Sequence, residues 1–547
     1  MNYENEGRIL LLDDERLVRF TISAWLKASN FSVTAVATPA EALQELKEKT
    51  YDAVLSDVMM GVVDGFMFRD TVRGFNEKIP IIFLTALVHS PTNHLLEKVA
   101  ADLYSYYAPK NSRRDYLLGR LRQAVAAYRA EREAETLNAR IETDLNIAAR
   151  VQHALLPPYT QYWDGICYGG FWRPHTIVSG DLFCWYPLSD HSAVAVFGDV
   201  AGHGTPAALA MTAVMAHLKE LERSEAVLAR RPELVCQEID TYIRNNLRDV
   251  TYVAGTVLFI NLRKHVVRYM NAGGLEPLCF RRSDGTRVEL NPDKHGALPM
   301  GLMDGTTYAP EDVVEMQIPD DALLFLYSDG FVDLTTDVAG EDRMPSDVFC
   351  EIIGEFIRGS SGTSDFASIP YRLAAVMKDM GYVHAQDDQS CCMIMAPLGG
   401  GMRFLTTVPM KNADCVNDAV DRASQWAASR GYSDGFIARL ELLLVEHLEN
   451  VRKHGLDDEE RRSEVVVLEM RPVDRDLEIL AWDRGLAYEG DLSESAPHPD
   501  LTLDAQNDKL AGSGRGLAIV RKICRRVTYD RFDCMNKFTF VLGVQES

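Results

Sequence analysis

The sequence lacks several features that mark whole classes of protein. Its ten cysteines form no CxxC pair, so neither a zinc knuckle nor a disulfide framework is indicated, and the reducing cytoplasm is the compartment that fits best. No apolar run reaches the roughly 18 residues that span a bilayer, and the first residues, MNYENEGR, lack the basic and apolar regions of a signal peptide. Basic residues are outnumbered 57 to 80, which gives a net charge of −23. Because nucleic acids and anionic membranes repel such a chain, we expect neither as a partner.

The composition is that of an ordinary globular protein, with 47% apolar and 25% charged residues over 547 positions. This length predicts three or four domains. The apolar patterns predict a multidomain protein of α/β and α+β type. We expect a doubly wound α/β domain over residues 1–112, a helical linker over 113–156, a layered α+β domain over 157–398 and an α/β sandwich over 399–547. The GGG at 399–401 marks the last boundary.

Three carboxylates follow buried strands in the first domain. Asp13 and Asp14 come directly after RILLL, and Asp57 follows AVLS. The carboxyl ends of parallel strands meet at one edge of a sheet, so these side chains are expected to converge there and to be joined by Mg²⁺. Thr85 ends the strand IPIIFLT and Lys110 follows the last strand, so a hydroxyl and a cation are expected beside them. A metal-bound Asp next to an ammonium is a plausible phosphoryl acceptor.

This stretch of about 120 residues resembles the receiver domain of two-component response regulators. The resemblance lies in LLLDDE, SDVMMGVVDG, LTA and a Tyr three residues before the Lys. It implies that Asp57 is the phosphoacceptor and that Asp13 and Asp14 help to hold Mg²⁺. It also implies that Thr85 and Tyr107 form a switch pair, and that a sensor histidine kinase is a partner. The alternative is a receiver fold that serves only for docking.

A helix is predicted between this domain and the next, because proline is absent from 113–156 and glycine occurs there only at 119. Pro157 and Pro158 end it. Its apolar residues follow coiled-coil spacing in two stretches, which predicts a seam between two copies and hence a homodimer. The alternative is a helix docked on its own domain. The apolar positions are Leu117, Leu121, Ala124, Tyr128, Leu137, Ile141, Ala148, Val151 and Leu155.

The central region carries aspartates in the contexts SGD, GDVAGHG, YSDG and QDDQS. Asp199 and Asp329 each end an apolar strand and precede a loop that contains glycine. Four acidic oxygen donors from separate strands suit a site for two Mg²⁺ or Mn²⁺ ions. Such a site activates a bridging water for attack on phosphorus, so no nucleophilic side chain is required. The four aspartates are Asp181, Asp199, Asp329 and Asp387.

Residues from about 140 to 396 resemble the sporulation and stress-response branch of the PPM-type serine/threonine phosphatases. The resemblance begins at DLNIAARVQHALLPP and continues through GDVAGHGTPAALAM, YMNAGGLEPL, LPMGL and LYSDGFVD. It implies that Asp181, Asp199, Asp329 and Asp387 are metal ligands, with Asp199 bridging both ions. Asp388 is a less favoured substitute for Asp387. His203 is expected to have a structural role in the glycine-rich turn.

The last domain contains three boxes that suit ATP. Glu446 and Asn450 lie four residues apart on a predicted helix at 434–454, where an Asn oxygen can bind nucleotide-associated Mg²⁺ and a Glu can act as general base. Asp483 ends a predicted strand at 477–482 and could accept a hydrogen bond from the adenine amino group, while Gly485 would let the backbone approach the base. GSGRG precedes a predicted helix at 515–526, which a final strand follows; its backbone N–H groups suit phosphates. The predicted nucleotide-binding residues there are Gly512, Gly514, Arg515 and Gly516.

This region resembles the GHKL ATPase fold, and among its members the anti-sigma-factor serine kinases. EHLENVRKHG carries the resemblance, and no helix with a phosphorylatable His precedes the domain. Ala487 departs from the pattern, because the family usually has glycine there. The alternative is a domain that binds ATP and captures a partner without phosphorylating it.

Together these resemblances imply a response regulator in which Asp57 phosphorylation controls opposing serine/threonine phosphatase and serine kinase activities. The implied substrate is an anti-sigma-factor antagonist of the STAS type, so that sigma-factor availability would change. A sigma or anti-sigma factor is a further candidate partner. The competing interpretation is a phosphatase-regulated anti-sigma module whose C-terminal domain binds ATP and captures its partner.

Overall fold

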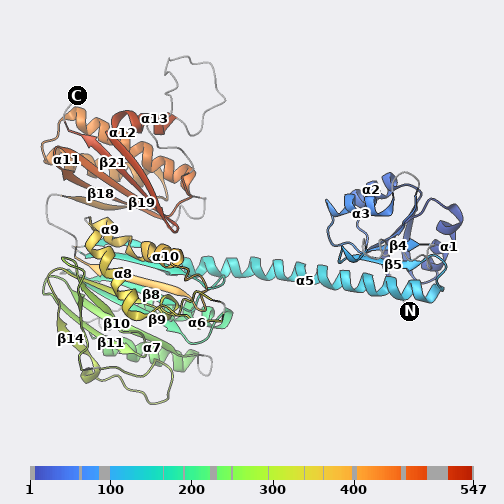
Figure 1. The fold of residues 1–547 in the computed structure, drawn as a ribbon. Helices are drawn as coiled ribbons and strands as arrows, with labels where there is room; N and C mark the ends of the chain where they lie inside the picture. The colour runs from blue at the N-terminus through green and yellow to red at the C-terminus, as the bar shows by residue number, and fades with distance from the viewer. Residues whose placement is uncertain are drawn as a thin grey trace. The chain divides into compact units, whose positions relative to one another are not determined.

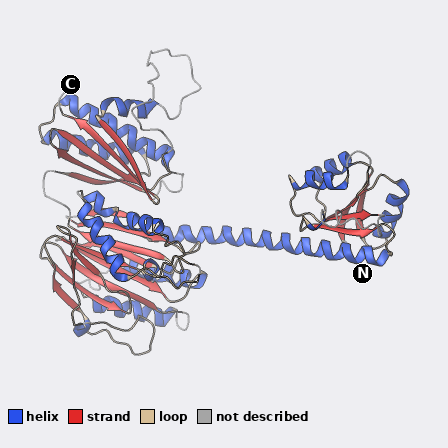
Figure 2. Ribbon diagram, in the orientation of Figure 1, coloured by secondary structure: helices blue, strands red, loops and turns tan. Residues whose placement is uncertain are grey.

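The structure is a computed structural model of the whole chain. The residues that it describes are 6–60, 64–85, 99–163, 166–188, 191–221, 231–247, 251–293, 295–337, 339–360, 362–396, 403–456, 464–488 and 515–544. The chain divides into two compact units, Met1–Asp144 and Leu145–Ser547. Figure 1 traces the elements, and Figure 2 separates helices from strands.

The first unit is a parallel five-stranded sheet wrapped by helices, as predicted. Its strand order, β2-β1-β3-β4-β5, reverses direction at β1, which places a crevice at the carboxyl ends of β1 and β3. The strands read as apolar runs because helices cover both faces of the sheet. The elements are β1 Gly7–Leu12, α1 Arg16–Lys27, β2 Phe31–Val36, α2 Pro39–Glu48, β3 Ala53–Asp57, α3 Gly65–Arg73, β4 Ile81–Thr85 and β5 Ser105–Pro109.

One helix, α5 Arg114–Leu155, covers the predicted linker and ends just before Pro157 and Pro158. Its first apolar stretch does not form a seam. Leu117, Leu121 and Ala124 are buried in the core of the first unit, so the docked alternative holds there. Leu137 and Ile141 are exposed in the second stretch, together with Ile147 and Val151. Among the described residues, none of the helices has both the length and the apolar character needed to cross a membrane.

The central part of the second unit is a four-layered sandwich. Two antiparallel sheets, β14-β11-β10-β9-β8 and β13-β12-β15-β16-β7-β6, pack face to face around one apolar cluster. α6 and α7 cover the first sheet, and α8, α9 and α10 cover the second. The bounds are β6 Thr160–Trp163, β7 Ile166–Arg173, β8 Leu182–Leu188, β9 Ser192–Val200, α6 Thr205–Leu221, α7 Pro232–Asn246, β10 Val253–Asn261, β11 Val266–Ala272, β12 Leu278–Arg281, β13 Arg287–Val288, η1 Pro310–Asp312, β14 Val314–Gln317, β15 Ala322–Tyr327, η2 Asp329–Phe331, α8 Ser346–Gly359, α9 Thr363–Ala367, α10 Ile369–Asp379 and β16 Gln389–Met395.

The C-terminal part is a five-stranded sheet of order β17-β18-β19-β21-β20, with α11, α12 and α13 on one face. One expectation was wrong: two final strands, not one, follow the last helix. A turn with Asp533 at φ 53° separates them, and the alternating polar residues of the first strand obscured it in the sequence. The bounds are β17 Phe404–Pro409, α11 Ala413–Ser429, α12 Asp434–Asn450, η3 Val451–Gly455, β18 Val465–Val473, β19 Asp476–Asp483, α13 Arg515–Ile523, β20 Arg526–Phe532 and β21 Met535–Gly543.

Candidate functional site

The carboxylates of the first unit meet where the sequence places them. Asp13 and Asp14 follow β1 and Asp57 ends β3, and each of the three offers a ligand oxygen within 4.8 Å of the others'. Asp13 and Asp57 are buried, whereas Asp14 is exposed. Burial raises the pKa of the Asp13 carboxyl, against the opposing effects of the Glu15 amide and Lys110. Clustered carboxylates of this kind fit a hard cation such as Mg²⁺, because oxygen ligands and a net negative charge are what it requires.

Lys110 closes this crevice. Its ammonium lies 2.6 Å from Oδ2 of Asp57 and 3.0 Å from Oδ2 of Asp13. Although burial lowers the pKa of Lys110, the two carboxylates outweigh it, so the pKa is raised and the side chain stays charged. Thr85 ends β4 and is buried beside it, and its carbonyl accepts a hydrogen bond from the Lys110 amide at 2.7 Å. The arrangement can hold an anionic group on Asp57 between a cation and a hydroxyl-bearing residue.

In the central domain, Asp199 lies near the end of β9, Asp329 begins η2 one residue beyond the end of β15, after Ser328, and Asp387 precedes β16. Burial is the main cause that raises the pKa of Asp199 to about 8, and repulsion from Asp387 and then Asp329 adds to it. Burial and Asp387 also raise the pKa of Asp329. The charged forms of Asp199 and Asp329 are thus destabilised by burial and by the neighbouring carboxylates. A divalent cation between them would remove that repulsion, which is how a metal site differs from a set of solvated aspartates.

Asp181 stands apart from those three. It is fully buried just before β8, and Oγ of Ser390 donates a hydrogen bond to its Oδ2 at 2.7 Å. Burial, followed by repulsion from Asp199, raises the pKa of Asp181 well above its usual range. Among the described residues, the tight group of three metal-ligating side chains is the one in the first unit, so the four aspartates here are neighbours without converging to 4.8 Å. Their assignment as metal ligands stays a prediction.

The choice between Asp387 and Asp388 has a structural basis. Both carboxylate oxygens of Asp388 accept backbone hydrogen bonds, from His175 N and Gly180 N at 2.7 Å each. These hydrogen bonds of Asp388 hold the loop that leads to Asp181 in place. Asp387 is half-buried and is the carboxylate that repels Asp199 and Asp329 most strongly. These contacts favour Asp387 as the ligand.

Gly330 brings the Asp329 turn and the Asp387 loop together. A Cβ at this position would lie 1.9 Å from the carbonyl oxygen of Asp388, so only glycine permits the approach. A cavity of about 140 Å³ opens beside Asp199 and Asp329 and is lined by Gly255, Gly274 and Ser328 among others. His203 is exposed between Gly202 and Gly204, which both have positive φ angles, in agreement with a place in a glycine-rich turn.

The α5 helix reaches this site through one residue that sequence reasoning did not single out. Gln152 is 1% exposed. Its side-chain amide donates to the carbonyls of Ser179 at 2.9 Å and Ala208 at 3.0 Å, and its oxygen accepts from Ser179 N at 3.1 Å. Ser179 lies two residues before Asp181, and Ala208 lies on α6 after the glycine-rich turn. The signal available in the sequence was a polar residue, Gln152, among the apolar residues at the end of the predicted helix.

The C-terminal domain contains a buried carboxylate, Asp483, in which one of the two oxygens has no hydrogen-bond donor among the described residues. Oδ1 of Asp483 accepts hydrogen bonds from Gly485 N at 2.8 Å and from Asn536 Nδ2 at 2.7 Å. Oδ2 is buried and has no hydrogen-bond partner in the described part of the chain. Burial raises the pKa of Asp483 to about 6. A buried acceptor that nothing satisfies fits an amino group supplied by a ligand, which is what adenine offers.

The other predicted nucleotide-binding residues are placed only in part. Glu446 and Asn450 lie half-buried on α12, four residues apart. Gly485 permits a close approach to η3, because a Cβ there would lie 2.6 Å from the Gly455 carbonyl; its expected approach to the base stays a prediction. Arg515 and Gly516 begin α13, whose backbone alone is described at that end. Gly512 and Gly514 lie outside the described residues. Asn536 was missed, although an Asn in an apolar strand is unusual.

Comparison with known families assigns each part. Residues 9–122 match the model for the response regulator receiver domain. Residues 189–396 match stage II sporulation protein E (SpoIIE), and residues 410–541 match the histidine kinase-like ATPase domain. The chain therefore carries a receiver domain, a PPM phosphatase domain of the SpoIIE type and a kinase-like ATPase domain, in that order.

Curated relatives match one part each. The response regulator MprA of Mycobacterium tuberculosis is 32% identical over 145 residues, 26% of this chain and 59% of the relative. The phosphoserine phosphatases RsbP and RsbU of Bacillus subtilis are 24% and 22% identical, over 35% and 39% of this chain and 46% and 60% of their own lengths. The chain thus spans about half the length of the curated relatives that it matches.

Two solved structures align with parts of the chain. The RsbU and RsbW domains of Rv1364c from Mycobacterium tuberculosis align over 71% of this chain and 94% of that chain, at 16% identity and a TM-score of 0.37. The SiaA-PP2C domain of Pseudomonas aeruginosa aligns over 48% of this chain and 98% of its own, at 20% identity and a TM-score of 0.38.

Proposed function

We propose that this protein is a phosphorylation-controlled switch that removes and adds a phosphoryl group on a serine or threonine of one partner protein. The observation that carries the proposal is the set of hydrogen bonds that Gln152 makes at the end of α5. The helix that begins in the core of the receiver ends with this side chain hydrogen-bonded to Ser179 and Ala208, two segments that flank the predicted phosphatase ligands. A change at the start of the helix has a covalent and hydrogen-bonded route to the site.

In the receiver, Asp57 accepts the phosphoryl group from a sensor histidine kinase. Asp13 and Asp14 hold the Mg²⁺ that supplies charge neutralisation when bound. Lys110, now 2.6 Å from Asp57, turns to the phosphoryl oxygens, and Thr85 contributes its hydroxyl. Loss of the Lys110–Asp57 ion pair on phosphorylation is the local charge change that biases the receiver.

In the phosphatase domain, Asp199, Asp329 and Asp387 hold Mn²⁺ or Mg²⁺, and Asp181 completes the acidic shell. The metals supply an activated water when they are bound. The chain's own contribution is to keep the acidic side chains desolvated and at fixed positions, through Gly330 and through the hydrogen bonds of Asp388. The substrate is a phosphoserine or phosphothreonine protein, for which a STAS-type anti-sigma-factor antagonist is the specific candidate.

In the ATPase domain, Asp483 orients the adenine and Asn450 binds the Mg²⁺ of ATP. Glu446 accepts the proton of the substrate hydroxyl as the phosphoryl group is transferred. Gly512, Gly514, Arg515 and Gly516 cover the phosphates. The two reactions act on the same hydroxyl in opposite directions, so the receiver would set the phosphorylation level of the partner and thereby the availability of a sigma factor.

A second candidate function keeps the ATP site but not the transfer, because no described contact holds Glu446 in a catalytic geometry. The domain would then capture a sigma or anti-sigma factor in an ATP-dependent way. Glu446→Gln separates the two, since it abolishes phosphotransfer under the kinase proposal yet leaves partner capture intact under the capture proposal. Asp434→Asn, at the exposed start of the same helix, is the matched control.

The experiment that tests the switch is Mn²⁺-dependent dephosphorylation of a phosphoserine STAS protein, with and without beryllofluoride to mimic phosphorylated Asp57. Activity that rises with beryllofluoride and is absent in Asp329→Asn supports a receiver-gated phosphatase. If the activity is the same with and without beryllofluoride, the phosphatase assignment stands and control by the receiver is rejected. Absence of activity in both conditions rejects the phosphatase and leaves the capture function.

A further inference from the structure

The phosphatase and ATPase domains share one continuous hydrophobic cluster. Phe366 and Tyr371 of α9 and α10 pack in it with Trp482 and Met535 of the C-terminal sheet. The hydroxyl of Tyr159, which lies just before β6, donates to the carbonyl of Val465 at 2.6 Å and that of Trp482 at 3.2 Å. The face of the C-terminal sheet opposite α11, α12 and α13 is therefore covered by the phosphatase domain.

Two adjacent strands of this sheet have the proposed nucleotide site on one face and the phosphatase domain on the other. In the antiparallel register of β19 and β21, Asp483 is opposite Asn536, and Trp482 is opposite Lys537. Consecutive side chains of a strand point to opposite faces. Asp483 and Asn536 form the hydrogen-bonded pair at the proposed nucleotide site, so their immediate neighbours form the pair that faces the phosphatase domain.

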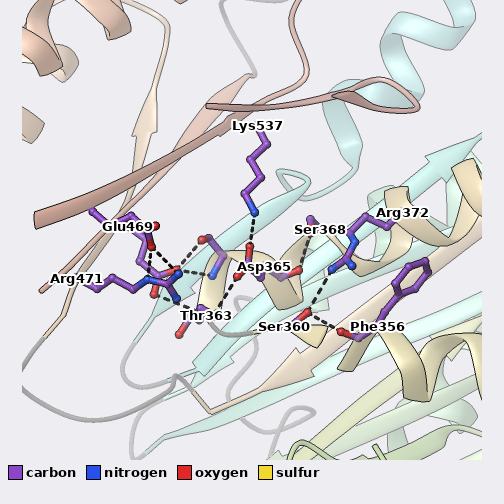
Figure 3. A network of polar contacts seen from close by, with 12 residues as sticks. Phe356, Ser360, Thr363, Asp365, Ser368, Arg372, Glu469, Arg471 and Lys537 are labelled. Carbon is purple, nitrogen blue, oxygen red and sulfur yellow. Dashed lines mark hydrogen bonds and ion pairs between the residues drawn. The ribbon is translucent and has the colours of Figure 1, made fainter. Parts of the chain in front are cut away.

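Lys537 makes the direct link. Its ammonium lies 4.8 Å from the centre of the Trp482 ring and 2.9 Å from Oδ1 of Asp365 in α9. Figure 3 shows the Lys537–Asp365 contact. Asp365 is 6% exposed, and its Oδ2 accepts a hydrogen bond from Gly362 N at 3.0 Å. Burial alone would raise the pKa of Asp365, but Lys537 outweighs it and holds the pKa below its usual range.

Glu469 of β18 makes a second link to the same helix. It is fully buried and accepts hydrogen bonds from Thr363 N at 3.2 Å and from Ser364 N and Oγ at 2.8 and 2.5 Å. Arg403 Nη1 lies 3.1 Å from it. The first amides of α9, which have no partner within a helix, are thus satisfied by a side chain of the other domain (Figure 3).

α9 is also close in sequence to the phosphatase ligands. It continues through Ser368 into α10, and the segment after α10 pairs His384 with Thr335 by two backbone hydrogen bonds of 3.2 Å. Thr335 follows the Asp329 turn, and His384 precedes Asp387 by three residues. A shift of α9 would therefore act on the segment that holds Asp329 and Asp387 together.

We propose that nucleotide bound at Asp483 regulates the phosphatase domain of the same chain through Asn536 and Lys537 to Asp365. This inference rests on the proposed nucleotide site and phosphatase, and adds a second input besides the receiver. An adenine amino group would donate to Oδ2 of Asp483 and weaken the hydrogen bond that Asn536 donates to Oδ1 of the same carboxylate. Lys537 is the next residue along the strand. By linkage, phosphatase ligands change nucleotide affinity by the same factor.

The test uses the full chain, p-nitrophenyl phosphate with Mn²⁺ as phosphatase substrate, and AMP-PNP as a nucleotide that cannot serve in phosphotransfer. Binding of AMP-PNP is measured by calorimetry. Hydrogen exchange of residues 362–371 is followed with and without AMP-PNP. We expect AMP-PNP to change kcat/KM at least threefold and to change the exchange of this segment in the same samples.

The decisive variant is Lys537→Met, which keeps an apolar chain over Trp482 but removes the charge. The double variant Asp365→Asn with Lys537→Met guards against misfolding, because it leaves no unpaired buried carboxylate. Arg525→Met is the control, since it removes an ion pair with Asp476 in the same sheet, away from α9. In both Lys537 variants, we expect AMP-PNP binding to persist and both responses to disappear.

The outcomes separate the inference from the proposed function. AMP-PNP that binds without altering turnover or exchange overturns the inference and leaves the nucleotide site. If AMP-PNP still changes both turnover and hydrogen exchange in the Lys537 variants, the proposed route through Lys537 and Asp365 is wrong. If AMP-PNP does not bind, the nucleotide site is wrong and the inference falls with it. If p-nitrophenyl phosphate is not turned over, hydrogen exchange of residues 362–371 tests the inference instead. A change with AMP-PNP in the wild type that is absent in the Lys537 variants supports it, and no change overturns it.

Discussion

The side-chain amide of Gln152 forms two hydrogen bonds with the backbone of Ser179, one in each direction, at 2.9 and 3.1 Å. A fully buried side-chain amide must find hydrogen-bond partners for both its donors and its acceptor. Here it does so against the segment that leads to Asp181. The helix end and the segment that carries the predicted ligand Asp181 are consequently parts of one hydrogen-bonded structure.

We expect Gln152→Leu to lower phosphatase turnover by about tenfold or more and to remove any stimulation by beryllofluoride. Leucine fits the space but removes the partner of the Ser179 N–H and carbonyl, each at a cost of about 1–3 kcal/mol. A loss of about 1.4 kcal/mol at the transition state is already tenfold. Steady-state kinetics with and without beryllofluoride measures both effects. Thr143→Leu, on an exposed turn of the same helix, should retain both; an equal loss in that control would contradict the interpretation.

Asp387 and Asp388 should respond oppositely to the same substitution. Asp387→Asn removes repulsion from Asp199 and Asp329, so the metal-free protein should melt no lower, while activity falls by more than the roughly 10–100-fold typical of outer-shell residues. Asp388→Asn loses one of two charge-assisted hydrogen bonds, so stability falls by about 1.5–3 kcal/mol. Thermal melts with EDTA or Mn²⁺ and turnover distinguish them. Mn²⁺ should stabilise the wild type but not Asp387→Asn. The reverse pattern would make Asp388 the ligand.

Asp483→Asn should abolish AMP-PNP binding while making the protein relatively more stable at high pH. The folded pKa of Asp483, about 6, lies above its usual value of 3.8, so the native carboxylate costs stability once the pH rises through this range. Between pH 5 and pH 8 the stability difference should shift toward the variant by roughly 1.4 kcal/mol. Urea denaturation at the two pH values measures the shift. A pH-independent difference would mean that Asp483 is not the titrating group.

Local patterns in the sequence predicted the parts of the fold that depend on periodicity. The apolar runs before Asp13 and Asp57 identified a parallel sheet, and the carboxyl-end rule then placed both at one edge. Asp199 and Asp483 could be found because each ends an apolar strand. Such positions are visible in the sequence because the strand and the turn that create the site are contiguous.

The residues that escaped prediction act between distant segments. Asn536, Lys537 and Glu469 make their contacts across 53, 172 and 105 residues respectively, and no spacing rule links such positions. The prediction of a seam was wrong for the first stretch of the helix for a related reason. Leu117 and Leu121 have coiled-coil spacing, but a core-facing helix has a similar apolar stripe, and only tertiary structure shows that the first unit buries them.

The second stretch of the helix still predicts a dimer. Ile141 is 47% exposed and Leu137 is 56% exposed, and an apolar stripe of this kind favours a second copy of the helix. Ile141→Asp should therefore convert a dimer into a monomer, measured by sedimentation of the full chain. Thr143→Asp, two residues away on another face of the helix, should remain dimeric. A monomeric wild type would contradict the prediction.

Glu469 should be a larger determinant of stability than an ordinary surface acid. It is fully buried, is paired with Arg403, and satisfies the first amides of α9. Glu469→Gln keeps the size of the side chain but has one acceptor oxygen, and its amide would face the donors of Ser364. We expect a loss of roughly 3 kcal/mol, seen as a lower urea midpoint.

The matched control is Glu315→Gln. Glu315 also pairs with an arginine, Arg268, at 3.0 Å, but its side chain is 62% exposed; solvent screening limits such a pair to about 0–1 kcal/mol. Because Glu469 links two domains, its loss should also uncouple their unfolding, so that one transition becomes two. A single transition with an unchanged midpoint would mean that the contact with α9 does not hold the two domains together in solution. The proposed route from the nucleotide site to the phosphatase domain would then have only the Lys537–Asp365 connection.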